Sequence, residues 1–232
     1  MTDTKPETAV QQPPSALRRR GAGAALIASG GVFFAAEFVA AAAWTDPPYS
    51  YTYHFISNLG VHGPSTGFGQ YMYSPLAWVM NAGFILFGLA ALAGVVMLGG
   101  LLGRRRWAAV AMAALLAIGV ILVARFPGSG EAFENGTAAY HGLGAFAAFI
   151  CGNILVIVIG RAHQVLGVPR RLGRALVVLG ILGFVSLAAF MVDLSAEAGV
   201  LIGLFERGAV YSVLIGFISV GVALRQHRNT PR

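Results

Sequence analysis

The clearest structural signal in the chain is GAALIASGGVFFAAEFVAAAAW, residues 23–44. The run is almost wholly apolar, with Glu37 as its one acidic residue. A helix rises about 1.5 Å per residue, so a run of this length spans the roughly 30 Å hydrocarbon core of a bilayer. A cleavable signal has a shorter apolar segment, so residues 23–44 favour a transmembrane helix over a signal peptide.

Five comparable apolar runs follow, at about 75–102, 107–124, 139–160, 175–193 and 208–224. The six runs predict an all-α polytopic transmembrane bundle of six helices. Composition agrees, because 57% of the 232 residues are hydrophobic and 11% are charged, whereas soluble domains carry about 25% charged residues. We expect the transmembrane domain over residues 21–225, a disordered basic cytoplasmic tail over 1–20, and a second tail over 226–232.

The basic residues predict the orientation of the bundle. If the N-terminus is cytoplasmic, all but two of the 16 Lys and Arg residues fall on the cytoplasmic side, and only Arg125 and Arg207 lie at the outer ends of helices. The positive-inside rule therefore predicts both termini in the cytoplasm of a multi-pass plasma (cell) membrane protein. The net charge of +7 lies in short runs between apolar stretches, which argues against a nucleic-acid partner.

Ionisable residues with candidate roles gather near the predicted outer face. Glu37 lies within a span, where an unpaired charge costs at least about 2.5 kcal/mol, so it must be protonated, paired or facing water. Arg125 and Arg207 stand at helix ends from which a long side chain can reach inward. Glu206 gains from the positive end of a helix, whereas Asp193 stands at a C-terminal end and needs a cation, a proton or a metal.

The longest outer connection contains PPYSYTYHFISNLG, residues 47–60. Its alternating aromatic residues suit the headgroup region of a membrane. One interpretation is local: Ser57 and Asn58 bond to nearby backbone, and Gly60 ends a short helix in the left-handed conformation. The other makes the connection a lid over an outward pocket, with His54 as acid, base or ligand and Ser57 as donor or nucleophile.

The sequence leaves open whether the protein is an enzyme. It contains no HExxH, GxSxG or Walker motif. A serine hydrolase could be built from Ser57, a histidine (His54 or His141) and Asp193. A divalent metal could equally be held by His54, His141 and a carboxylate such as Asp193, because imidazole is a good ligand. Cofactors are otherwise unknown.

Four short motifs resemble a known family: FISNLG at 55–60, RFP at 125–127, HG at 141–142 and GLFERG at 203–208. They resemble the prokaryotic membrane family catalogued as domain of unknown function 998. The resemblance implies six helices and an outer cluster of motifs, without a reaction. A weaker similarity links FISNLG to the Frag1/DRAM/Sfk1-type membrane proteins, which are associated with lipid handling. In those proteins an acid stands where this chain has Asn58.

The leading hypothesis is an outward-facing polar pocket within the membrane that binds a lipid or isoprenoid-like amphiphile for modification or movement. The candidate catalytic residues are Glu37, His54, Ser57, His141 and Asp193. The candidate ligand-binding residues are Arg125, Glu206, Arg207 and Asn58. The alternatives are a non-enzymatic assembly or sensory protein and a small-metabolite or ion carrier. The sequence does not distinguish a monomer from a homo-oligomer.

Overall fold

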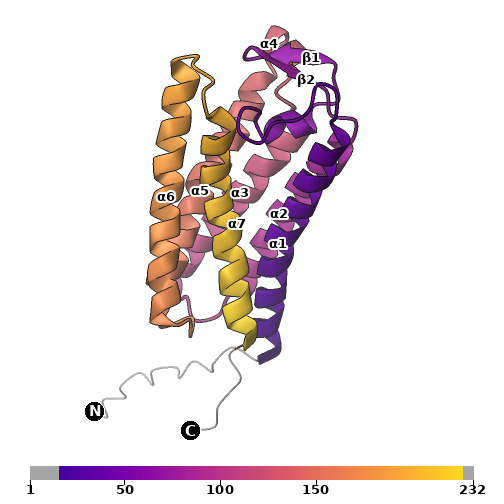
Figure 1. Ribbon diagram of the computed structural model, residues 1–232. Helices are drawn as coiled ribbons and strands as arrows, with labels where there is room; N and C mark the ends of the chain where they lie inside the picture. The colour runs from indigo at the N-terminus through magenta and orange to yellow at the C-terminus, as the bar shows by residue number, and fades with distance from the viewer. Residues whose placement is uncertain (1–15, 227–232) are drawn as a thin grey trace, which may run out of the picture.

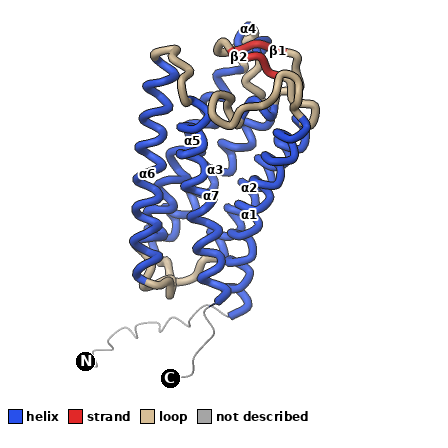
Figure 2. Tube along the Cα trace, viewed as in Figure 1, coloured by secondary structure: helices blue, strands red, loops and turns tan. Residues whose placement is uncertain are grey.

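The computed structural model describes residues 16–226, so most of the tails predicted for residues 1–20 and 226–232 lies outside the described residues. The described chain is helical almost throughout, which confirms the all-α prediction (Figure 2). Six of its helices are long and apolar enough to cross a membrane. They are α1 (Ala16–Ala43), α2 (Ala77–Met97), α3 (Gly103–Arg125), α5 (Ala138–Arg161), α6 (Arg170–Ser195) and α7 (Ile202–Gln226).

The six long helices form one closed ring. Each packs against two neighbours in the order α1, α2, α3, α5, α6, α7 and back to α1, and α5 also touches α7. Figure 1 shows the helices side by side, with the first residues of α1 and the last of α7 at the same end. The bundle therefore has two distinct ends. We call them the arginine end, where α1 begins, and the loop end, where α1 meets the longest connection.

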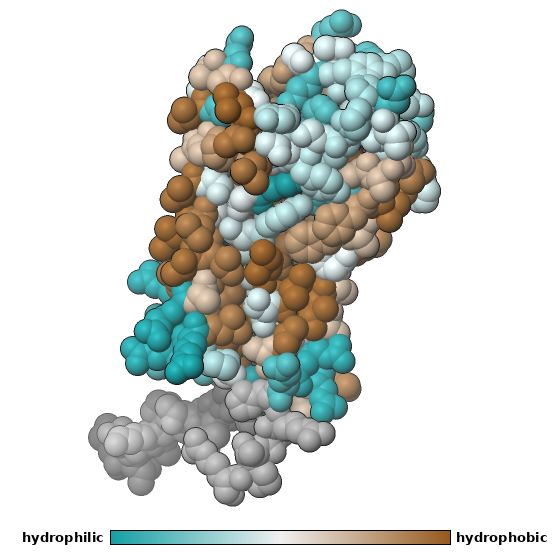
Figure 3. Space-filling view, in the orientation of Figure 1, coloured by the Kyte–Doolittle hydropathy of each residue, from teal (hydrophilic) through white to brown (hydrophobic). Residues whose placement is uncertain are grey.

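The surface of the bundle has the character of a membrane protein. On the face seen in Figure 3, hydrophobic residues cover much of the middle of the bundle and hydrophilic residues lie toward both ends. Among the described residues, every arginine except Arg125 and Arg207 belongs to a helix terminus at the arginine end. The predicted sorting of cations to one end of the helices is thus confirmed. The assignment of that end to the cytoplasm stays a prediction.

Several helices extend beyond their predicted bounds. Arg18–Arg20 were assigned to the tail but belong to α1, and α6 begins at Arg170 rather than near 175. A search for apolar runs finds only the part of a helix that lies in the hydrocarbon core of the bilayer. The helix itself continues past the core in hydrogen-bonded turns that carry arginine. α2 ends earlier than predicted, at Met97. The apolar residues that follow form a turn containing Gly100, whose φ is +90°.

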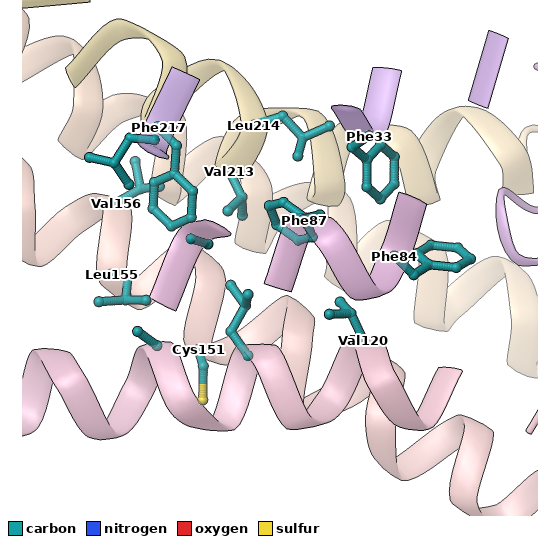
Figure 4. Packing of buried hydrophobic residues seen from close by; sticks show 14 of the residues in the cluster. Phe33, Phe84, Phe87, Val120, Cys151, Leu155, Val156, Val213, Leu214 and Phe217 are labelled. Carbon is teal, nitrogen blue, oxygen red and sulfur yellow. The ribbon is translucent and has the colours of Figure 1, made fainter. Parts of the chain in front are cut away.

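Small residues allow the helices to pack closely. At three junctions, a Cβ added to either of two facing glycines would collide with the backbone of the other, so only glycine permits the approach. These pairs are Gly23 with Gly221, Gly119 with Gly144, and Gly160 with Gly173. Larger apolar side chains fill the centre of the ring, where Phe33, Phe84 and Phe87 meet (Figure 4). Glycine therefore allows close helix packing at these sites.

The loop end carries a small cap. It contains the 3₁₀ helix η1 (Ser57–Gly60), the hairpin of β1 (Ser65–Gly67) and β2 (Gln70–Met72), and the short helix α4 (Gly130–Glu134). Asn58 Nδ2 donates to Gln70 Oε1 at 2.6 Å and links η1 to the hairpin. The left-handed conformation predicted for Gly60 is wrong, since its φ is not positive. Gly60 instead lets Asn81 approach and donate to its carbonyl oxygen at 2.9 Å.

Candidate functional site

A buried ion pair between α1 and α7 lies near the loop end. Arg207 Nε donates to Glu37 Oε1 at 3.0 Å, and Arg207 Nη2 lies 3.0 Å from the same oxygen. Tyr211, one turn along α7, donates from its hydroxyl to the Glu37 carboxylate. Both charged side chains are almost inaccessible to solvent. Glu37 was expected to be protonated, paired or facing water, and the structure shows it paired with Arg207.

Arg207 also holds the connection between α1 and α2 in place. Its Nη1 donates to the carbonyl oxygens of Tyr51 at 2.7 Å and His54 at 3.1 Å, and to that of Gly203 on its own helix. Its Nη2 donates to the Tyr49 hydroxyl, and the guanidinium lies over the rings of Tyr49 and Tyr51. The donors of Arg207 are thus occupied by protein atoms. Burial raises the pKa of Tyr49, which keeps the phenol protonated.

The first glycine of the GLFERG motif, Gly203, lies where the connection between α1 and α2 passes close to α7. A Cβ added there would collide with the carbonyl oxygens of Tyr51 and His54, the two loop groups that Arg207 binds. Gly203→Ala is therefore expected to lower the free energy of unfolding by about 1–3 kcal/mol, as overpacking commonly does. Gly31→Ala on exposed α1 surface meets no atom within 4 Å and serves as control. Denaturation in detergent micelles measures both. Equal stability of the two variants would contradict the close approach.

Next to the ion pair lies a chamber inside the ring. It consists of two adjoining pockets with volumes of about 50 Å³ and about 100 Å³. The pockets share five lining residues, Ser57, His141, Ala145, Phe149 and Glu206. The first pocket extends inward among phenylalanine, leucine and valine side chains of α1, α2, α3 and α7. The second lies between α5, α6 and the cap.

Three polar side chains that line both pockets come from separate elements. Glu206, only 6% exposed, accepts a hydrogen bond from the backbone N–H of Ile56 and another from that of Ser57. His141 Nδ1 lies 2.8 Å from the carbonyl oxygen of Phe126, so Nδ1 carries the proton and donates. Ser57 stands at the start of η1. Three of the predicted motifs, FISNLG, HG and GLFERG, therefore meet at this chamber.

The remaining candidate residues lie outside the shared lining. His54 stacks on Trp44, and its Nδ1 accepts from the backbone N–H of Ser50 at 3.0 Å. Burial, with a contribution from Arg207, lowers the pKa of His54. Asp193 accepts from the N–H groups of Val200 and Leu201. Asp193 thus accepts ordinary backbone hydrogen bonds just before α7, and the cation, proton or metal expected for it stays a prediction.

Two further candidates, Arg125 and Asn58, lie apart from the ion pair and from the lining that the two pockets share. Arg125 is exposed at the end of α3, and so it does not join Arg207 at the ion pair. Asn58 is buried, and it lines only the second pocket of the chamber. No hydrogen bond within residues 16–226 links His54 or His141 to Asp193. The hydrolase triad and the three-ligand metal set are therefore not assembled, and the described residues hold no group of three or more His, Cys, Asp or Glu placed to bind a metal ion.

Sequence reasoning missed two residues of the ion-pair cluster. Tyr211 lies within the predicted apolar span at 208–224, which gives no sign of a polar role. It stands four residues after Arg207 and so shares one helix face with it. Tyr49 was read as an interfacial aromatic, but its hydroxyl donates to the carbonyl oxygen of Phe55 and accepts from Arg207. The spacing from Arg207 could have found Tyr211. Only the folded loop could place Tyr49.

The architecture defines a polytopic α-helical integral membrane protein, with a six-helix ring and a chamber at the loop end. Comparison with protein families then gives the assignment. The family model described as a protein of unknown function (DUF998) matches residues 16–223, nearly the whole described chain, and the protein belongs to that family. Neither the comparison with curated proteins nor the comparison with solved structures finds a match to this chain.

Proposed function

We propose that the protein binds a lipid or isoprenoid-like amphiphile in the chamber at the loop end, for modification or movement. The observation that carries this proposal is the division of the chamber lining. Its walls are mostly aliphatic and aromatic, while Glu206, His141 and Ser57 gather where the two pockets join and Asn58 lines the second pocket. An apolar pocket with a few convergent polar groups is the usual form of a small-molecule site. A chain enters the apolar part and a polar group stays beside these three residues.

The chamber is suited to a ligand that arrives through the membrane. Phe146 lines the second pocket and is 42% exposed on α5, so this pocket reaches the surface between α5 and α6. An apolar cavity of about 150 Å³ is enough to hold benzene. The chamber therefore takes one segment of a chain, and the rest of the amphiphile lies in the bilayer. The sorting of arginine supports an outward-facing loop end.

Ala145→Phe tests the proposal by filling the chamber. Ala145 lines both pockets, and a benzyl group there occupies the space assigned to the ligand. Mass spectrometry of protein extracted with its lipids is expected to show a specific bound lipid on the wild type and at least about a tenfold loss on the variant, equivalent to about 1.4 kcal/mol. Ala145→Leu provides a smaller filling substitution if the phenylalanine variant does not fold.

The matched control is Ala188→Phe, which places the same group on the exposed surface of α6. It is expected to retain the lipid. Wild-type protein without a specific lipid, or equal lipid retention by Ala145→Phe and Ala188→Phe, would refute the binding proposal. That result would favour the assembly or sensory role, in which the polar residues only join helices.

A further inference from the structure

The described lining of the chamber carries no guanidinium or ammonium group. Neither pocket includes Arg or Lys among its described residues. The two cations at the loop end are elsewhere: Arg207 uses its donors on Glu37, Tyr49 and backbone carbonyl oxygens, and Arg125 is exposed. A phosphate or carboxylate in the chamber would therefore lack the charge-assisted donors that normally bind such groups.

The polar groups shared by both pockets offer acceptors, and Asn58, which lines only the second pocket, donates to Gln70. Glu206 is held as an acceptor by the N–H groups of Ile56 and Ser57, and a carboxylate has about four lone-pair sites for two such bonds. With Nδ1 of His141 donating to Phe126, Nε2 of the neutral ring is an acceptor. The Nε2 edge faces Gly128, which lines the second pocket. Ser57 can donate or accept.

This pattern selects the chemistry of the ligand. A hydroxyl or amine head can donate to Glu206 or to His141 Nε2, and a hydroxyl can also accept from Ser57. An anionic head would instead place its own acceptor oxygens against the Glu206 oxygens, which the N–H groups of Ile56 and Ser57 hold as acceptors, so its oxygens would be buried without donors. Resting on the proposed function, we infer that the amphiphile presents a hydrogen-bond-donating head, an alcohol or an amine, and not a phosphate or carboxylate.

Three probes with one chain length separate these headgroups: dodecan-1-ol, dodecylamine and dodecyl phosphate. Full-length protein in phosphatidylcholine nanodiscs is titrated with each, and binding is followed by native mass spectrometry and by the shift in melting temperature. We expect the alcohol, the amine or both to bind at least about tenfold more tightly than the phosphate, because only these heads donate hydrogen bonds to the acceptors of the chamber.

Glu206→Gln tests which residue sets this preference. The amide oxygen can still accept from Ile56, so the fold is retained, but the acceptor facing the ligand is weakened. The preference for alcohol or amine over phosphate is expected to fall by about tenfold. Glu131→Gln, on the short helix α4 at the same end, provides a control that leaves the preference unchanged.

The outcomes distinguish this inference from the proposed function. If wild-type protein binds the phosphate as tightly as the alcohol and the amine, and Ala145→Phe abolishes that binding, the chamber is a ligand site and the headgroup inference is overturned. An unchanged preference in Glu206→Gln overturns it as well. If no probe binds and no lipid co-purifies with the wild type, the proposed function itself fails.

Discussion

Replacing Arg207 by methionine is expected to lower the free energy of unfolding by about 3–5 kcal/mol, because removal of one partner of a buried ion pair leaves an uncompensated charge. Here the abandoned group is Glu37, which is 0% exposed. The same change leaves the carbonyl oxygens of Tyr51 and His54 and the hydroxyl oxygen of Tyr49 without the hydrogen bonds that Arg207 donates. Unfolding by denaturant in detergent micelles measures the loss.

A double variant separates the cost of the abandoned charge from the loss of loop contacts. Glu37→Leu combined with Arg207→Met removes both charges, and we expect it to be more stable than Arg207→Met alone. Arg125→Met, which removes the exposed cation at the same end, should change stability by less than about 0.5 kcal/mol. If Arg207→Met unfolds at the same denaturant concentration as Arg125→Met, the buried pair does not stabilise the bundle.

The number and polarity of the spans could be predicted because both follow from local composition. Each span must be apolar over the thickness of the bilayer, and arginine marks the same end of every span except α2. The exact helix ends could not be predicted in this way. Hydrogen bonding continues through Arg170 and Arg171 at the start of α6, where the chain is no longer apolar. Helix formation and membrane burial are separate requirements.

The membership of the candidate site depended on contacts that a sequence does not contain. Glu206 and Arg207 are neighbours on α7, yet Glu206 lines the chamber and Arg207 pairs with Glu37. Adjacent helical residues point in directions about 100° apart, so they commonly have different partners. Sequence order placed both residues at the loop end. Only the packing of α1 against α7 shows that Arg207 joins the structural ion pair and that Glu206 lines the candidate ligand site.

The cap shows a second limit of sequence reasoning. Phe68 and Gly69 form the turn between β1 and β2, and both have positive φ, +50° and +70°. Asn-Gly or Asp-Gly is the usual sequence for such a turn, because a bulky residue is disfavoured in this conformation. Phe68 packs edge-on against Phe55 and Phe133 and lines the second pocket. These tertiary contacts outweigh the local preference and position an aromatic ring beside the chamber.

Phe33→Ala is the second substitution with a large expected effect. Phe33 is 2% exposed, packs edge-on against Phe84 and Phe87, and lines the first pocket (Figure 4). Truncation of a buried phenylalanine costs about 3–5 kcal/mol, through lost contacts and the cavity left behind. Denaturant unfolding should show a loss of this size. Phe38 on the same helix is 53% exposed, so Phe38→Ala should lower the free energy of unfolding far less.

The same cavity gives Phe33→Ala a functional consequence. The deleted ring lies at the inner part of the chamber, so its removal lengthens the apolar space beyond Glu206 and Ser57. If an acyl or isoprenoid chain occupies that space, the variant should bind longer alcohols more tightly, at about 0.8 kcal/mol for each further buried methylene group. Titration with alcohols of increasing length measures this shift relative to wild type. Loss of stability with an unchanged length preference would show that Phe33 supports the helices without bounding the ligand site.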